Sequence, residues 1–138
     1  MPGRASVVAV TSIQPELWVG QPAAAVDFYQ AAFGARVLHR VDHGEDVVAQ
    51  LAVGDAVFWV SGGGAEPPRF APSAIGGATG RTLLVTGDPD AMFARAVRAG
   101  ATPASGPADE HGWRLARILD PFGHEWELGH PLSAWPPA

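Results

Sequence analysis

Alternation of apolar and polar residues predicts a first strand with an unusually polar face. Residues 12–20 (SIQPELWVG) follow the period of two that is typical of a β-strand. Leu17 and Val19 lie on one predicted face of this strand. The opposite face carries three side chains that can contact a ligand, Gln14, Glu16 and Trp18.

One helix and three more strands are predicted after this strand. The helix begins at Pro22, where a missing N–H costs nothing, and Gly34 ends it. The strands cover residues 35–41, 46–53 and 56–61, and a tight turn at 54–55 joins the last two. One face of this hairpin is entirely apolar, whereas the other includes Gln50 and Trp59.

The same order of elements is predicted again after residue 80. It comprises a strand at 81–86, a helix at 88–99, and strands at 102–104, 113–119 and 124–128. The helical segments AAVDFYQAAFGA (24–35) and DAMFARAVRAGA (90–101) also align with each other, and each ends in a Gly-Ala pair that leads into a strand. The sequence therefore predicts a duplicated βαβββ unit.

A segment rich in glycine and proline, residues 62–80, separates the two halves and shows neither a helical nor a strand period. Long loops in compact domains are often functional lids, but a flexible connector fits this composition equally well. We expect one domain over residues 1–138, with a first half at about 8–62, a second half at about 81–131 and a tail at 132–138. In that tail, Trp135 can pack on a partner, pack on its own domain or be frayed.

Composition narrows the possible functions. The 138 residues are 47% hydrophobic, which suits one core, and the net charge of -5 with only 9 lysines and arginines argues against nucleic-acid binding. The absence of cysteine excludes disulfides, thiolate catalysis and cysteine-based zinc sites. The apolar run near the N-terminus is too short for a signal peptide or a membrane span, so we expect a cytoplasmic protein with no membrane partner.

Two stretches, VDFYQAAFGARV (26–37) and EHGWRLARILDPFGHEWELGHP (110–131), resemble motifs of the vicinal oxygen chelate superfamily, which includes glyoxalases, dioxygenases and bleomycin resistance proteins. The resemblance extends from about residue 12 to residue 131. It implies an α+β fold in which two βαβββ modules form a curved, mostly antiparallel sheet around a cavity. It also implies a homodimer, with the cavity completed across the subunit interface.

Metal-dependent members of that superfamily place ligands at four strand positions, which by resemblance correspond here to Gln14, Trp59, Arg81 and Glu127. Trp59 offers no lone pair to a metal, and Arg81 remains protonated at physiological pH. We therefore expect neither a metal nor another cofactor, and we expect Arg81 and Glu127 to form an ion pair across the pseudo-twofold axis. His124 is expected to be a turn residue that follows Asp120-Pro121-Phe122-Gly123.

The leading functional hypothesis is non-catalytic binding of a small, bulky aromatic molecule, such as an antibiotic natural product. Tryptophans on a concave sheet can stack on planar rings, although they can equally be ordinary core residues. The candidate ligand-binding residues are Gln14, Glu16, Trp18, Gln50, Trp59, Arg81, Trp113, Arg114 and Glu127.

Two enzymatic alternatives remain open. One is a metal-dependent lyase, isomerase or dioxygenase that uses Gln14 and Glu127 with a further ligand, His111 or His124. The other is a metal-free enzyme that uses Glu127 or Glu16 as a general base. The remaining histidines, His39, His43 and His130, are expected to be surface or turn residues.

Overall fold

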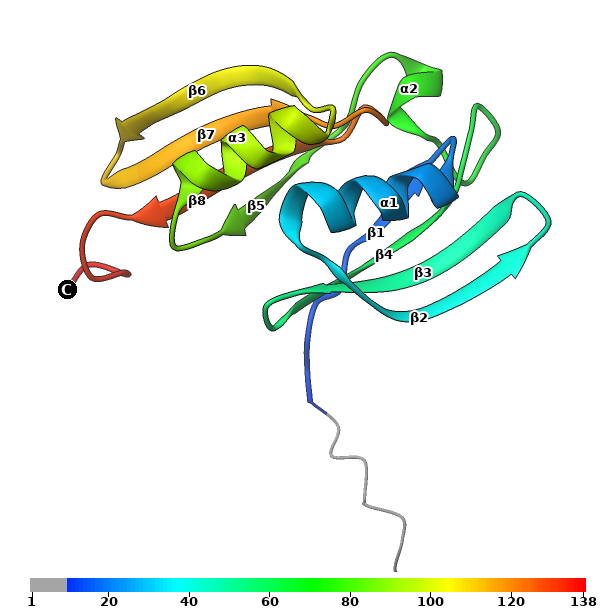
Figure 1. Cartoon of the computed structure of the whole chain (residues 1–138), viewed down its shortest axis with the longest axis horizontal. Coiled ribbons are helices and arrows are strands. Elements are labelled where there is room, and N and C mark those ends of the chain that lie inside the picture. Colours follow the sequence, from blue (N-terminus) through cyan, green and yellow to red (C-terminus); the bar gives the residue numbers. More distant parts are fainter. Residues whose placement is uncertain (1–9) are drawn as a thin grey trace, which may run out of the picture.

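Residues 10–138 are described by a computed structural model, shown in Figure 1. Residues 1–9, which include the start of the N-terminal apolar run and the beginning of the expected first half, lie outside the described part. The first module contains β1 (Glu16–Val19), α1 (Pro22–Phe33), β2 (Arg36–His43), β3 (Asp46–Val53) and β4 (Ala56–Gly62). The second contains β5 (Arg81–Val85), α3 (Pro89–Ala99), β6 (Thr102–Glu110), β7 (Trp113–Leu119) and β8 (Glu125–Pro131).

Both modules have the same topology. Their sheets have the strand orders β1-β4-β3-β2 and β5-β8-β7-β6, and in each the first strand pairs in parallel with the last. The other pairs in each sheet are antiparallel. This arrangement confirms the predicted α+β fold of two βαβββ modules.

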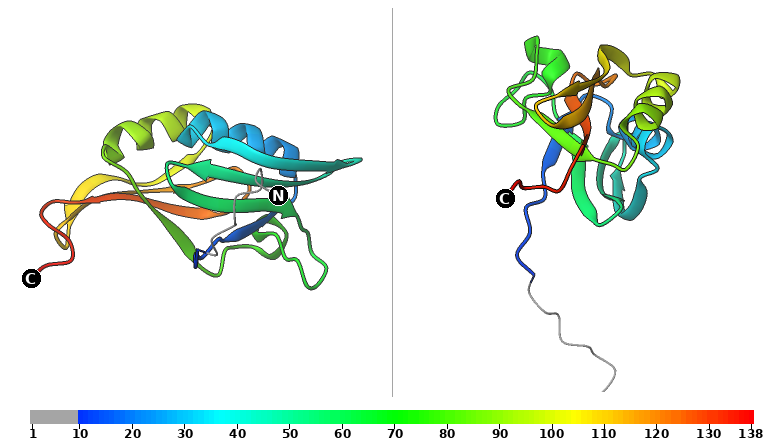
Figure 2. Two further views of the ribbon diagram at one scale, coloured as in Figure 1. Left: turned by 90° about the horizontal axis from the view of Figure 1, so that it is seen from below. Right: turned by 90° about the vertical axis from the view of Figure 1, so that its left-hand side faces the viewer.

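The two long helices lie side by side on the same side of the two sheets (Figures 1 and 2). Helix α1 starts with Pro22 at its first turn and ends at Gly34, which adopts a left-handed φ of 68°. Asp88 caps α3 by accepting a hydrogen bond from the backbone N–H of Ala91 at 3.0 Å. None of the helices in residues 10–138 is long and apolar enough to cross a membrane.

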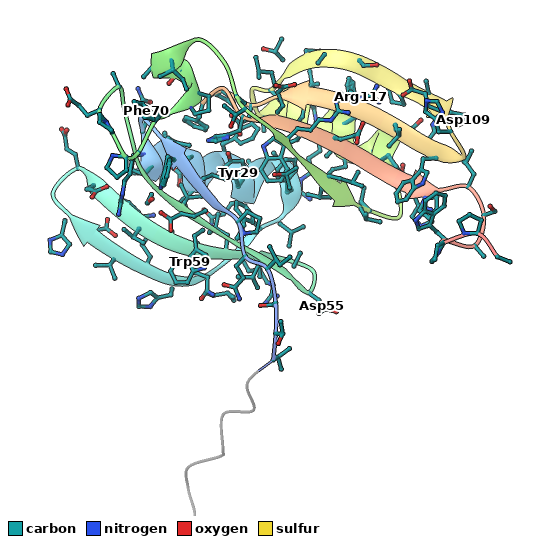
Figure 3. The ribbon with its side chains drawn as sticks, turned by 180° about the vertical axis from the view of Figure 1, so that it is seen from behind. Tyr29, Asp55, Trp59, Phe70, Asp109 and Arg117 are labelled. Atoms are coloured by element: carbon teal, nitrogen blue, oxygen red, sulfur yellow. The ribbon has the colours of Figure 1, made fainter. Side chains whose placement is uncertain are left out.

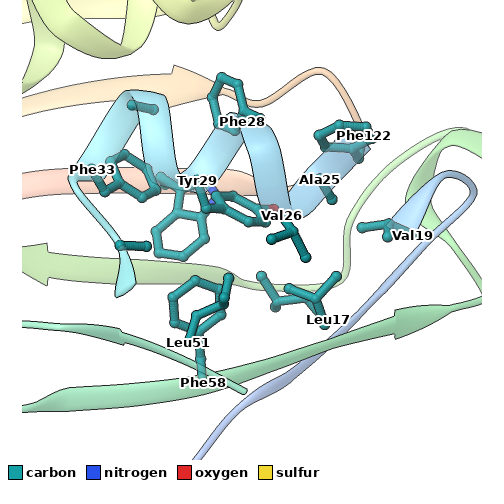
Figure 4. Close-up of a cluster of buried hydrophobic side chains, with 14 of the residues drawn as sticks. Leu17, Val19, Ala25, Val26, Phe28, Tyr29, Phe33, Leu51, Phe58 and Phe122 are labelled. Carbon is teal, nitrogen blue, oxygen red and sulfur yellow. The ribbon is translucent and has the colours of Figure 1, made fainter. Parts of the chain in front are cut away.

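Aromatic side chains from both modules form a single core beneath the helices (Figure 4). Tyr29 of α1 lies between Phe58 of the first sheet and Trp126 of the second, with ring centroids 5.4 and 5.5 Å away. Phe33 also contacts Trp126, at 4.8 Å between centroids. Because each module buries its rings against the other, the pair folds around one shared hydrophobic cluster.

Strands β1 and β6 differ most from their predicted lengths. Strand β1 begins at Glu16 rather than at residue 12, because Pro15 has no N–H to continue the ladder and only its carbonyl bonds to β4. Strand β6 runs to Glu110 rather than to residue 104. It is an edge strand whose register shifts twice near its prolines, and edge strands tolerate both features.

The segment between the modules is more ordered than its composition predicts. It contains a one-turn helix, α2 (Pro72–Ile75), and a β-bridge between Gly64 and Phe70. Backbone hydrogen bonds of 3.0 Å from Gly64 to Arg69 and 2.9 Å from Ala71 to Gly64 close its first loop. The segment is therefore a folded wall of the module junction, even though its sequence has neither a helical nor a strand period.

Candidate functional site

The two sheets present a set of polar and aromatic side chains on the face turned away from α1 and α3, here called the helix-free face. Figure 3 views this side, with Trp59 on the first sheet and Arg117 on the second. On β3, Ala49 and Leu51 are fully buried toward the helix, whereas Gln50 between them is half-buried. Strand alternation thus separates the core from the candidate site.

Gln14, just before β1, bonds to two side chains of the first sheet. Its Oε1 accepts a hydrogen bond of 2.8 Å from the indole Nε1 of Trp59 and one of 3.3 Å from Nε2 of Gln50. Trp59 and Gln50 are directly opposite each other on β4 and β3. Gln14, Gln50 and Trp59 therefore lie together on one face of the first sheet, as predicted.

Glu16 is the centre of a second group on β1. Its Oε2 accepts a 2.8 Å bond from the indole Nε1 of Trp18 and a 3.0 Å bond from the hydroxyl of Ser61. Both donors are neutral, so they orient the carboxylate without cancelling its charge.

On the second sheet, charged side chains form a chain across all four strands. Arg117 Nε donates to Glu127 Oε2 at 2.8 Å, and its Nη1 donates to Glu110 Oε2 at 3.0 Å. Arg81 Nη2 lies 3.5 Å from the same Glu127 oxygen. Burial acts to lower the pKa of Arg117, but its bonds to Glu127 and Glu110 raise that pKa above the ordinary value.

Arg117 is a site residue that was not predicted, and the Arg81–Glu127 pair lies elsewhere than predicted. Arg81 and Glu127 lie on neighbouring strands of the same sheet, so their ion pair does not cross the pseudo-twofold axis. Arg117 could have been found, because alternation along β7 puts it on the face of Trp113, and the β7–β8 register places it opposite Glu127.

Arg114, a predicted ligand-binding residue, does not lie on the helix-free face with Trp113. Its guanidinium bonds to Asp90 of α3 at 2.8 Å and to Asp109 of β6 at 3.2 Å. Those bonds raise the pKa of Arg114 and lower that of Asp90. Adjacent residues of a strand point to opposite faces, so Arg114 faces the helix while Trp113 does not.

Trp113 and two histidines have local roles in the structure. Trp113 packs edge to face on Trp135 of the tail, at 5.2 Å between ring centroids, so that tail tryptophan packs on its own domain. His124 follows the turn after β7, and its Nε2 lies 2.8 Å from the backbone oxygen of Trp18 in the other module. His111 lies in the β6–β7 turn with a φ of 52°.

Two hollows open at the junction of the modules. The larger, the inter-module cavity, has a volume of about 600 Å³ and lies between residues 10–15, the β3–β4 hairpin and β5. Phe58 and Trp126 line it, together with Gln14 and Leu83. The smaller, the linker pocket, measures about 330 Å³ and is lined by Glu16, Trp18 and the 62–80 segment.

The chain also matches a known protein family. The model of the Glyoxalase/Bleomycin resistance protein/Dioxygenase superfamily matches residues 9–128. The chain belongs to this superfamily. Members that bind small molecules include TnmS3, described as an antibiotic binding protein from Streptomyces sp. CB03234, whose structure is 25% identical with a TM-score of 0.67 and covers 91% of this chain and 99% of its own.

Two other proteins are more similar to the chain in sequence. TioX from Micromonospora sp. ML1 is 30% identical with a TM-score of 0.68, and the match covers 90% of this chain and 98% of TioX. The protein Rv0887c of Mycobacterium tuberculosis is 36% identical over 131 residues, covering 88% of this chain and 75% of that protein.

The metal-ligand positions of the glyoxalase superfamily do not fit a divalent cation in this chain. Gln14 Oε1 already accepts two hydrogen bonds, and Glu127 Oε2 lies within 4 Å of two guanidinium groups. Within residues 10–138, no three His, Asp or Glu side chains are grouped closely enough to hold a metal ion. The donor set favours hydrogen bonding to a ligand over coordination of a cation.

The structure distributes the predicted ligand-binding residues over several places. Gln14 lines the inter-module cavity, and Glu16 and Trp18 line the linker pocket. Trp59 and Gln50 contact Gln14 on the adjoining sheet. The second-sheet residues Arg81, Trp113 and Glu127 line neither hollow.

Proposed function

We propose that this protein binds a small, planar aromatic molecule, such as an antibiotic natural product, in the inter-module cavity and holds it without transforming it. The hydrogen bond between Trp59 and Gln14 carries this proposal. Gln14 and Trp59 correspond to two of the positions at which metal-dependent members of the superfamily place their ligands. Here the indole of Trp59 donates to the amide oxygen of Gln14, which would otherwise face a cation. This pair therefore suits a polar edge, fixed at Gln14 of the cavity and continued by the Trp59 ring on the adjoining sheet, better than a Lewis-acid site.

The size and chemistry of the cavity support the same function. Its volume of about 600 Å³ falls within the range of about 300–1,000 Å³ that is common for small-molecule pockets. Leu17, Phe58, Leu83 and Trp126 give it apolar walls, and Gln14 supplies a polar group. An apolar ring system can lose its hydration there while one edge keeps a hydrogen bond.

The similarity to TnmS3 supports a binding role, since that protein is described as an antibiotic binding protein. Drug sequestration needs tight binding and no chemistry. Neither of the candidate general bases, Glu16 and Glu127, lines the inter-module cavity, which meets that need.

We also propose that two copies of the chain form a homodimer in which the partner completes the binding site. Leu83 and Val85 of β5 are 43% and 58% exposed on the helix-free face, beside the cavity. Covering them with a second copy would remove apolar surface from water and deepen the site. Light scattering during gel filtration would report twice the chain mass, whereas a monomer at ligand-binding concentrations would contradict this arrangement.

Three of the groups that the enzymatic alternatives would use, Gln14, Glu127 and His124, are already engaged by other residues. A metal-dependent reaction would use Gln14 and Glu127, which already engage other side chains, and His124 bonds to the Trp18 carbonyl. As a general base, Glu127 would have to use a carboxylate that already accepts a hydrogen bond from Arg117 and lies 3.5 Å from Arg81.

Calorimetric titration with planar aromatic compounds tests the proposed function. We would titrate the protein with anthraquinone and acridine derivatives, and then recover each compound and compare its mass before and after incubation. We expect saturable binding and unchanged compounds. Absence of binding by every compound, together with a stoichiometric metal in chelator-free protein and turnover that requires it, would overturn the proposal in favour of an enzyme.

A further inference from the structure

The linker pocket is a second hollow with its own chemistry, separate from the cavity that carries the proposed function. It measures about 330 Å³ and lies between β1 of the first module, residues 70–80 and His124 of the second module. Glu16 provides its carboxylate, and Trp18 and Phe70 provide aromatic surface.

Local hydrogen bonds fix the walls of this pocket. The N–H of Gly63 donates to the carbonyl of Val19 at 2.9 Å, which starts the loop against β1. A Cβ on Gly63 would come within 2.8 Å of the Trp18 Cβ, so the chain passes too close for any other residue. On the opposite side, His124 Nε2 lies 2.8 Å from the carbonyl of Trp18.

The charge of Glu16 has no cationic partner in the part of the chain that the structure describes. No Arg, Lys or His nitrogen of residues 10–138 lies within 4.0 Å of its carboxylate. Only the indole of Trp18 and the hydroxyl of Ser61 bind it, and both donate to Oε2. On the helix-free face of the second sheet, by contrast, Glu110 and Glu127 each lie within 4.0 Å of an arginine.

We propose that the linker pocket binds an organic ammonium group, namely a protonated amine carried by the aromatic ligand. The Glu16 carboxylate supplies the countercharge, and the rings of Trp18 and Phe70 supply faces that attract a cation. This inference rests on the proposed function, because it assigns a basic side arm to the ligand of the inter-module cavity. Successive residues of β1 line the two hollows, Leu17 the cavity and Glu16 and Trp18 the linker pocket. Glu16 remains open to solvent, so an amine can reach it.

A matched pair of probes tests the ammonium site by calorimetry at pH 7. The probes are 2-(aminomethyl)naphthalene, which is protonated at this pH, and 2-naphthalenemethanol, its neutral counterpart of similar shape. We expect the amine to bind about tenfold more tightly to the wild-type protein. Glu16→Gln, which can still accept from Trp18 and Ser61, should abolish this preference. Phe70→Leu should reduce it while leaving the alcohol almost unaffected.

Glu45→Gln, at the exposed β2–β3 turn, is the control and should keep the full preference. Equal affinity for both probes in the wild-type protein, or a preference that persists in Glu16→Gln, overturns the ammonium site. If neither probe binds although the anthraquinones and acridines do, the ammonium site is wrong and the proposed function stands. If those compounds also fail to bind, both proposals fail.

Discussion

Tyr29 of α1 donates its phenolic hydrogen to Asp120, which precedes β8 in the other module, and both side chains are buried. Asp120 also accepts from the indole of Trp126 at 2.9 Å and from the backbone N–H groups of Phe122 and His124 at 2.9 and 3.0 Å. One carboxylate therefore fixes the turn after β7 and joins it to the first module. The two walls of the inter-module cavity depend on this junction.

Removing the Asp120 carboxylate should destabilise the fold strongly. Asp120→Ala leaves buried donors on Tyr29 and Trp126 without an acceptor, and we expect a loss of about 3 kcal/mol or more in the free energy of unfolding. Tyr29→Phe removes one donor only and should cost about 1 kcal/mol. Urea denaturation measures both, with Asp109→Ala on the exposed edge strand as a control. A loss below 1 kcal/mol for Asp120→Ala contradicts this role.

The same pair predicts how stability depends on alkaline pH. Burial, then the charge of Asp120 and its hydrogen bond, raise the pKa of Tyr29 well above the ordinary value of 10.0. The unfolded chain therefore loses this proton first, and the stabilisation is complete below pH 10. It declines as the pH rises from 10 through the raised pKa, by about 1.4 kcal/mol per pH unit.

Tyr29 is the only tyrosine of the chain, so absorbance at 295 nm reports its ionisation directly. We expect no tyrosinate signal in folded protein at pH 10.5 and about three-quarters of the full signal in urea-unfolded protein at the same pH. Tyr29→Phe should remove the decline in stability above pH 10. A folded-state titration centred near pH 10 would contradict the buried environment.

Local pattern was enough to predict the parts of the fold that depend on neighbours in sequence. The β3–β4 hairpin was correct in both its faces, because a period of two and a Gly-Asp turn fix its register. Helix α1 was correct because Pro22 and Gly34 mark its ends. The lengths of β1 and β6 were wrong, since both are edge strands whose limits depend on one partner strand and on where prolines interrupt the ladder.

The candidate site was predictable only within a strand. Gln14, Gln50 and Trp59 were grouped correctly because each belongs to an alternating pattern. Alternation along β7 would also have predicted Arg117, rather than Arg114, as the arginine on the helix-free face. The inter-module cavity was beyond this reasoning, because its walls come from residues 10–15 and β5, which meet only through the shared aromatic core.

The two arginines of β7 should differ in their effect on stability. Arg117→Gln leaves the half-buried Glu127 with only the 3.5 Å contact to Arg81, and we expect a loss of about 1–2 kcal/mol in the free energy of unfolding. Arg114→Gln breaks exposed ion pairs that solvent screens, and it should cost clearly less than Arg117→Gln. Chemical denaturation of both variants decides this, and a larger loss for Arg114→Gln would reverse the assignment of the two faces.

Divalent cations should not stabilise the protein. Gln14 Oε1 is occupied by Trp59 and Gln50, and Glu127 faces two guanidinium groups, so a cation would have to displace existing hydrogen bonds. Thermal unfolding in excess Zn²⁺, Ni²⁺ or Mn²⁺ should give the same midpoint as unfolding in EDTA. A rise of several degrees with one of these ions would show linkage to a metal site and favour the enzymatic alternative.

Replacing Trp59 should separate its two roles in ligand binding. Trp59→Phe keeps an aromatic face but loses the N–H that holds Gln14 at 2.8 Å, so affinity for anthraquinones should fall about threefold to tenfold. Trp59→Leu loses both features and should weaken binding further, by about another tenfold. Calorimetry avoids the change in fluorescence that each variant causes. Trp135→Leu, which alters an exposed tryptophan of the tail, is the matched control and should bind like the wild-type protein. Equal affinity for all four proteins would remove Trp59 from the site and leave the cavity walls alone to account for binding.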